Sequence, residues 1–188
     1  MGQDPELLRP ALFVSEARAM LVVPHDPAWA RAFTAEAQAI GAALEGPLIA
    51  LHHIGSTAIP DILAKPIIDM LAEVRDLADL DQAAPALVAL GYQAMGEFGI
   101  PGRRYFRKED AAGTRIHHLH AFAQGSPHVV RHLAFRDYLR AHPARAADYD
   151  ALKQRLAADP DHYVERKGPF VLATEAEALA WSAERGGY

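Results

Sequence analysis

Two segments, HHIGSTAIP at residues 52–60 and KPIIDML at residues 65–71, set the architecture of this chain. A turn of small residues, Gly55-Ser56, ends one apolar segment, and a single acid, Asp69, lies inside the next. Glycine lets the backbone approach a ligand closely, and the N–H groups and hydroxyls that follow it can face phosphate oxygens. The pattern therefore predicts either a phosphate site beside an acid or an ordinary tight turn between two strands, because Gly-Ser pairs are also common in plain turns.

The segments around this turn predict the strands of one sheet. Residues 48–55 and 66–74 are short apolar runs on either side of it. The run at 66–74 is mostly apolar, which is typical of a strand at the centre of a sheet. Residue types and spacing predict further strands at residues 92–97, 103–109 and 115–123, with a shorter candidate at 20–23.

Helices are predicted where apolar residues recur at helical spacing and where capping residues precede them. Asp26 followed by Pro27, and Ser126 followed by Pro127, are typical helix starts. The predicted helices cover residues 27–45, 79–90, 127–141, 144–157 and about 173–185, with a short one at about 58–64. This order predicts an α/β (α+β) fold, a mixed β-sheet flanked by helices with a helical C-terminal part.

Composition restricts the class of protein. The chain has 188 residues, 51% of them hydrophobic, which suits a single domain with a substantial core, assigned to residues 21–188. Residues 1–20 lack the pattern of a signal peptide and are set apart as a leader or as vector-derived residues. A net charge of −5 argues against a general nucleic-acid binder. The absence of cysteine fits a reducing cytoplasm, and no apolar run is long enough to span a membrane.

Asp69 is the first candidate metal ligand. An acid on the strand next to a phosphate-binding turn can hold a divalent ion that bridges phosphate oxygens. Two-metal transfer chemistry normally needs two or three converging carboxylates, but the next residue on the same strand face is Leu71. Glu73 shares that face and lies about 13 Å along a straight strand, so it cannot bind the same ion.

Histidines can supply the missing ligands. In IHHLHAF, residues 116–122, His118 and His120 share one strand face and His117 lies on the other. Two neutral imidazoles at this spacing can share a metal ion, and the alternative is a polar strand whose histidines bond to neighbouring groups. We predict a divalent ion (Mg, Mn or Zn) held by Asp69, His118 and His120.

A basic stripe follows on the helix predicted at 127–141. Every fourth residue is basic, and Arg131 lies beside the row formed by His128, His132, Arg136 and Arg140. Such a stripe is either a solvated helix face or a wall that receives phosphate.

Five segments in order resemble the GrpB family: HHIGSTAIP, AKPIIDML, HHLHAF, GSPHVVRHLAFRDYLRAHP and YVERKGPFV. That family is placed within the polymerase-beta-like nucleotidyltransferase superfamily, so the resemblance implies a nucleotidyltransferase-like sheet. It implies that Gly55-Ser56 matches the glycine-serine signature of the superfamily and that Asp69 matches its first metal-binding acid. The superfamily expects a second acid at the position of Leu71, and this sequence departs from it there.

The same match points to further binding residues. Lys65, at the mouth of the central strand, is either a phosphate ligand or an ordinary strand-end lysine. Arg104, beside Tyr105, either holds a nucleotide by charge and stacking or protects an edge strand with its charge. The predicted phosphate-binding set is Gly55, Ser56, Lys65, Arg104, Arg131 and Lys167.

Two classes of function stay open at this point. The first is a metal-dependent nucleotidyltransferase that acts on a nucleotide or phosphorylated small molecule, with Asp69 and Ser56 as catalytic residues. The second is a non-catalytic module of the same fold that binds such a molecule. Neither class implies a membrane or nucleic-acid partner.

Overall fold

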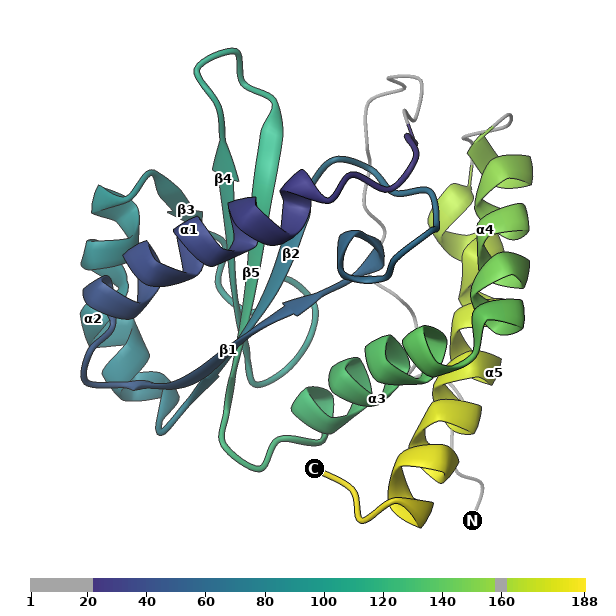
Figure 1. Ribbon diagram of the computed structural model, residues 1–188. Helices are drawn as coiled ribbons and strands as arrows, with labels where there is room; N and C mark the ends of the chain where they lie inside the picture. Colours follow the sequence, from purple (N-terminus) through teal and green to yellow (C-terminus); the bar gives the residue numbers. More distant parts are fainter. Residues whose placement is uncertain (1–21, 158–161) are drawn as a thin grey trace, which may run out of the picture.

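The computed structural model describes residues 22–157 and 162–188 and contains a five-stranded sheet (Figure 1). Its strands are β1 (Leu48–Ile54), β2 (Ile68–Val74), β3 (Tyr92–Ala94), β4 (Arg103–Glu109) and β5 (Arg115–Ala123). They lie in the order β1-β2-β5-β4-β3, with β2 parallel to β5 and the other neighbours antiparallel. The predicted mixed sheet is confirmed, and the apolar segment at 66–74 does form an interior strand.

Helices lie on both faces of this sheet. They are α1 (Ala28–Ala43), α2 (Leu77–Ala89), α3 (Pro127–Ala141), α4 (Pro143–Ala157) and α5 (Tyr163–Glu184), with the 3-10 turn η2 (Ser56–Ala58) after β1. Figure 1 shows α4 and α5 beside α3, at the opposite end of the molecule from α2. None of the helices in residues 22–157 and 162–188 is long and apolar enough to cross a membrane.

Two predicted helix starts are confirmed by their capping contacts. Asp26 Oδ1 accepts the N–H of Ala28 at 2.8 Å, and Ser126 Oγ accepts the N–H of His128 at 3.3 Å. Each bond satisfies a donor that the first turn of a helix would otherwise leave unpaired.

One face of the sheet packs against α1 and α2. Alternate residues of β2 and β5 point to this side and are fully or almost fully buried. They form the largest apolar cluster with residues of both helices: Ile68, Met70, Ala72, Val74, Leu119 and Ala121 with Ile40, Leu44, Leu80 and Leu87. This cluster is the main core of the protein.

The opposite face of the sheet is covered in part by α3. Ile54, Leu71 and Phe122 are buried there against Val129 and Leu133 of α3. The rest of this face carries polar residues of β2, β4 and β5, so α3 closes one end of the face, and the polar residues occupy the remainder.

The segment between β1 and β2 differs from its prediction. The prediction of a short helix at 58–64 is wrong, because the helical structure consists of one 3-10 turn that ends at Ala58. Beyond it, Ile59 and Ile62 are buried against α3 and α4, and Ala64 forms an isolated bridge with Val23. That bridge is the part of the strand expected at 20–23 that lies within the described residues. Residues 20 and 21 and the predicted leader lie outside the described residues.

Two other boundaries differ from their predictions by three residues or more. β3 ends at Ala94, three residues before the predicted end of that strand. α5 begins at Tyr163, ten residues earlier than predicted, and continues through Gly168 and Pro169. Those two residues are typical helix breakers. Tertiary contacts outweigh them here, because the ring of Phe170 stacks on Tyr149 of α4 with centroids 5.5 Å apart.

Candidate functional site

Strand register brings Asp69 and His118 together. Asp69 of β2 is the direct partner of His118 in β5, and on its other side it is paired with Ile54 of β1. Paired residues leave a sheet on the same face, which here is the face that α3 partly covers. The two side chains meet, with His118 Nδ1 lying 3.0 Å from Asp69 Oδ1. A carboxylate only accepts hydrogen bonds, so Nδ1 carries the proton.

The Gly55-Ser56 turn lies directly against this acid. Gly55 follows Ile54 with φ of +70°, and a Cβ at this position would lie 2.4 Å from Asp69 Oδ2. The turn therefore approaches the carboxylate as closely as backbone can, which only glycine permits. Ser56 begins η2, and its hydroxyl has no hydrogen-bond partner among the described residues.

Two lysines converge beside the acid. Lys65 Nζ lies 5.5 Å from the centre of the Tyr163 ring, and Lys167 Nζ lies 5.6 Å from the centre of the same ring. Neither lysine forms an ion pair within residues 22–157 and 162–188. Burial, followed by the charge of Lys167, lowers the pKa of Lys65. Burial would also lower the pKa of Lys167, but Tyr149 and Tyr163 outweigh it and raise that pKa.

These charges keep Asp69 ionised. Burial would raise the pKa of Asp69, but the hydrogen bond from His118, the neighbouring imidazoles of His118 and His120 and the charge of Lys167 hold it below its ordinary value. The Asp69 side chain is nevertheless 31% exposed to solvent, so a ligand can reach it. The centre thus combines an accessible carboxylate, a glycine turn and two lysines without carboxylate partners.

His120 lies two residues beyond His118 on the same face of β5, and its side chain contacts Arg103 and Tyr105. Its Nδ1 lies 3.3 Å from Arg103 Nη1, and its ring centroid is 5.1 Å from that of Tyr105. Burial lowers the pKa of His120 to about 3, so the ring is neutral near pH 7. Because arginine only donates, His120 Nδ1 accepts, and the proton of the neutral ring is on Nε2. A metal ion could bind His120 only after a change of tautomer or release of Arg103.

His118 is better suited to hold a metal ion. With its proton on Nδ1, the lone pair of the neutral ring is on Nε2, which is buried and has no partner among the described side chains. A carboxylate that fixes the tautomer of a metal-binding histidine in this way is a common arrangement. Within residues 22–157 and 162–188, no group of three or more His, Asp or Glu side chains is arranged to hold an ion. Asp69 Oδ2 and His118 Nε2 are each free of a protein donor, but Nε2 points away from the carboxylate, so the two groups can share an ion only if the hydrogen bond between His118 and Asp69 breaks.

The position expected for a second acid is part of the core. Leu71 is fully buried and packs with Val129 and Leu133 of α3. Glu73 is a further two residues away, where it is paired with Ala50 and Phe122. α3 therefore covers β2 immediately beyond Asp69, and a carboxylate at position 71 would be buried beneath it.

Two residues of the predicted phosphate-binding set lie elsewhere. Arg104 is on the opposite face of the sheet and forms two hydrogen bonds with Asp81, at 2.6 and 2.7 Å. Arg131 pairs with Glu175 of α5 at 2.5 Å. Gly55, Ser56, Lys65 and Lys167 are the members that the structure brings near Asp69.

Sequence reasoning missed Tyr149, which contributes to the surroundings of Lys167. Its ring centre lies 5.9 Å from Lys167 Nζ. Tyr149 is on α4 and Lys167 is on α5, so no local sequence pattern connects them.

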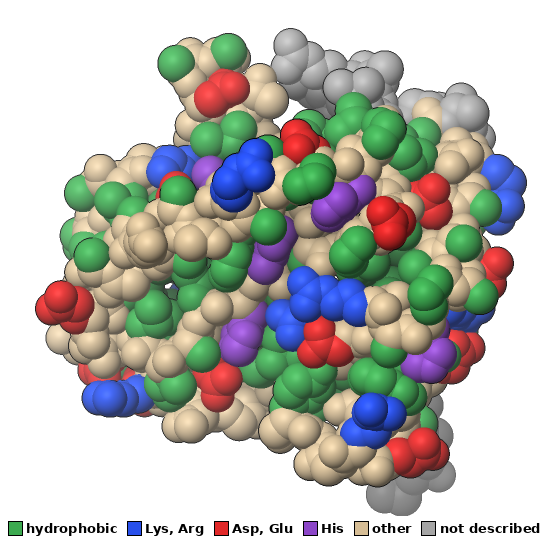
Figure 2. Space-filling view, in the orientation of Figure 1, with side chains coloured by type: hydrophobic (Ala, Val, Ile, Leu, Met, Phe, Trp, Pro, Cys, Tyr) green, Lys and Arg blue, Asp and Glu red, His purple; other side chains and the backbone are tan. Residues whose placement is uncertain are grey.

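Histidine, arginine and acidic side chains gather between β1 and α3 in the space-filling view (Figure 2). Residues of the basic stripe of α3 contribute to this group, and several of them contact the backbone. Arg136 and Arg140 donate hydrogen bonds to backbone carbonyls of residues 53 and 58, and His132 Nδ1 lies 2.6 Å from the carbonyl oxygen of His128.

Comparisons with known proteins agree with this fold. Residues 19–177 match the family model described as GrpB protein. The crystal structure of the conserved protein GrpB from Enterococcus faecalis is similar with a TM-score of 0.79 and 39% sequence identity, over 85% of this chain and 98% of that one.

Two longer proteins contain a similar stretch. YqkA of Bacillus subtilis is 43% identical over 172 residues, which cover 89% of this chain and 50% of YqkA. A dephospho-CoA kinase of Mycolicibacterium paratuberculosis is 32% identical over 196 residues, which cover 88% of this chain and 47% of the kinase. This chain therefore spans about half the length of each of these relatives. The family match and the shared fold show that the chain belongs to the GrpB family.

Proposed function

We propose that the Asp69 centre binds a nucleotide or another phosphorylated small molecule in the cytoplasm, together with a divalent metal ion. The observation that carries this proposal is the convergence of Lys65 and Lys167 on one tyrosine ring beside the Gly55-Ser56 turn. Two ammonium groups without carboxylate partners favour an anion, and the Ser56 hydroxyl and the turn supply uncharged donors for phosphate oxygens.

A metal ion fits this proposal for electrostatic reasons. An ionised Asp69 repels a phosphate unless a cation lies between them. Asp69 Oδ2, beside the turn, would hold that ion, whose chemical contribution is to neutralise and polarise the phosphate oxygens. His118 would orient the carboxylate through its Nδ1–H, or would join the ion through a ring nitrogen if that hydrogen bond breaks. Carboxylate and phosphate oxygens alone suit magnesium or manganese, and a histidine ligand would favour manganese or zinc.

Calorimetry tests this proposal with nucleoside triphosphates, pyrophosphate and dephospho-CoA as probes, each with Mg²⁺, Mn²⁺ or Zn²⁺. Lys65→Met and Lys167→Met are expected to weaken phosphate binding about tenfold or more, because each removes a charged hydrogen-bond donor. Lys108→Met is the matched control, since Lys108 lies on the opposite face and pairs with Glu36. If the wild-type protein binds none of the probes with any metal, the proposal fails.

Nucleotidyl or phosphoryl transfer is the second candidate function. It is favoured by the Asp69–His118 pair, in which the free Nε2 of His118 can accept a proton from an attacking hydroxyl. Binding is expected to be more robust than turnover, since the strand offers one acid where two-metal enzymes use several. Mass spectrometry of products from wild-type protein and Asp69→Asn tests it, and fast turnover that survives Asp69→Asn would exclude these residues.

A further inference from the structure

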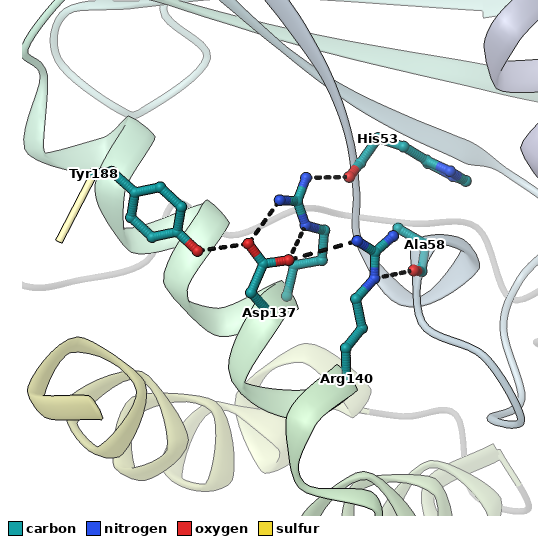
Figure 3. A network of polar contacts seen from close by, with 6 residues as sticks. His53, Ala58, Asp137, Arg140 and Tyr188 are labelled. Carbon is teal, nitrogen blue, oxygen red and sulfur yellow. Dashed lines mark hydrogen bonds and ion pairs between the residues drawn. The ribbon is translucent and has the colours of Figure 1, made fainter. Parts of the chain in front are cut away.

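Two arginines of α3 hold the backbone on both sides of the Gly55-Ser56 turn (Figure 3). Arg136 Nη1 donates to the carbonyl oxygen of His53 at 3.0 Å, just before the turn. Arg140 Nε donates to the carbonyl oxygen of Ala58 at 2.8 Å, just after it. The turn is thus bound at each end by a residue more than eighty positions away in sequence.

Both carbonyls need such a donor. β1 is an edge strand of the described sheet, so the carbonyls on its outer side have no neighbouring strand to pair with. Ala58 ends η2, and the last carbonyls of a helical turn also lack internal partners. A hydrogen bond from a charged group to such an oxygen is worth about 1.5–3 kcal/mol, more than a neutral one.

Asp137 fixes the two guanidinium groups in place. It accepts hydrogen bonds from Arg136 Nε at 2.6 Å and from Arg136 Nη2 at 2.8 Å. This bidentate pair sets the plane of the guanidinium group. The same carboxylate lies 3.5 Å from Arg140 Nη1 and accepts from the hydroxyl of Tyr188. Burial would raise the pKa of Asp137, but its bonds with Arg136 and Tyr188 outweigh this and lower it.

We propose that Arg136 and Arg140 are positioning residues that keep Gly55-Ser56 against Asp69, so that ligand affinity depends on them although they do not contact the ligand. This role rests on the proposed function, since it concerns the same centre. It makes the basic stripe of α3 a support for the phosphate-binding turn. The predicted consequence is that loss of either arginine loosens η2 and weakens binding without unfolding the protein.

Amide hydrogen exchange and calorimetry together test this role. The amides of Ala58 and Ile59 bond to the carbonyls of Gly55 and Ser56, so their exchange reports opening of the turn. Arg136→Met and Arg140→Met are expected to speed exchange at these amides about tenfold and to weaken binding of pyrophosphate or ATP with Mn²⁺ to a similar extent. Arg140→Lys keeps a charged donor, so its exchange rates and its ligand affinity are expected to be close to those of the wild type.

Arg145→Met is the matched control. Arg145 lies on α4, pairs with Glu177 at 2.9 Å and stacks on Phe170, away from the turn. Its loss is expected to leave both readouts unchanged. Unchanged exchange at Ala58 and Ile59 in the α3 variants overturns the proposal, and so does faster exchange with wild-type affinity. If wild-type protein binds no probe, the proposed function fails, and the exchange rates still decide whether the arginines hold the turn.

Discussion

The carboxylate of Asp69 occupies the space that a side chain at position 55 would need. A Cβ on Gly55 would lie 2.4 Å from Asp69 Oδ2 and 2.9 Å from Asp69 Cβ. The backbone of Gly55, with φ of +70° and ψ of −174°, is in a region that is essentially restricted to glycine. Contact and conformation therefore both exclude a larger residue here.

Gly55→Ala is expected to reduce the free energy of unfolding by about 2–4 kcal/mol, the sum of backbone strain and the collision with Asp69. Gly113→Ala is the matched control, because Gly113 also has positive φ, at +75°, and nothing within 4 Å of its added Cβ. Urea denaturation of both variants measures the difference. Equal losses would show that Asp69 does not press against the turn.

Acid is expected to destabilise the protein through His53. Its ring stacks on Phe33 with centroids 4.9 Å apart, and its Nε2 lies 3.0 Å from Thr57 Oγ1. Burial, with a smaller contribution from Arg140, lowers the pKa of His53 from 6.5 to about 4. The unfolded chain then binds more protons than the folded one between these values, so stability is complete above pH 6.5 and decreases as the pH falls towards 4.

A shift of this size is worth on the order of 3 kcal/mol when the transition is complete. Urea midpoints measured from pH 7.5 to pH 4.5 are expected to fall less steeply in His53→Gln than in the wild type, because glutamine keeps an N–H donor and does not titrate. His162→Gln, at an exposed position, controls for loss of a histidine as such. An identical pH dependence in His53→Gln and wild type would contradict this account.

Leu71→Asp is expected to destabilise the protein and to add no metal affinity. It would place a carboxylate under α3, against Val129 and Leu133 and between His52 and His120 of the neighbouring strands, whose pKa values are lowered by burial. Burying an unpaired charge there is expected to cost at least about 4 kcal/mol. Leu71→Asn separates the cost of charge from that of lost packing. A stable Leu71→Asp protein with tighter Mn²⁺ binding would mean that α3 leaves this position open.

Pro169→Ala is expected to increase stability by about 1–3 kcal/mol, since proline inside a helix removes one hydrogen bond and crowds the preceding turn. Pro169 lies within α5, where the carbonyl of Glu165 is left without its helical donor. Thermal unfolding of Pro169→Ala checks this, and Pro85→Ala, at the other internal helix proline, provides a comparison. A lower Tm for Pro169→Ala would show that the proline fixes α5 against its neighbours.

The sheet was predictable from the sequence because its signal is local. In β2, apolar residues fill one face and Leu71 adds a buried residue to the other, and in β5 the alternation of His117, His118 and His120 assigns each ring to a face without knowledge of the partner strands. α5 was not fully predictable, since Gly168 and Pro169 are local signals of a break. The contact of Phe170 with Tyr149, which stabilises the helix there, depends on a different helix.

The candidate site was predictable only in part for the same reason. Asp69 and the Gly-Ser turn are separated by a short loop, so their contact follows from the order of the strands. Alternation shows that Arg103 and Arg104 lie on opposite faces of β4, but not which face carries the site. The structure places Arg104 with Asp81 on the far side. The approach of Lys65 to Lys167 needs the packing of α5, which no local pattern encodes.

Asp69 and His118 are 49 residues apart and meet across two parallel strands. A hairpin cannot join two parallel strands, so the chain between β2 and β5 contains α2, β3 and β4. The contact between Asp69 and His118 forms only when β5 pairs with β2. Long-range pairings of this kind are expected to form late in folding. A nascent chain that ends before Arg115 therefore already carries the glycine turn and the acid, but it acquires the histidine that fixes their chemistry only when β5 completes the centre of the sheet.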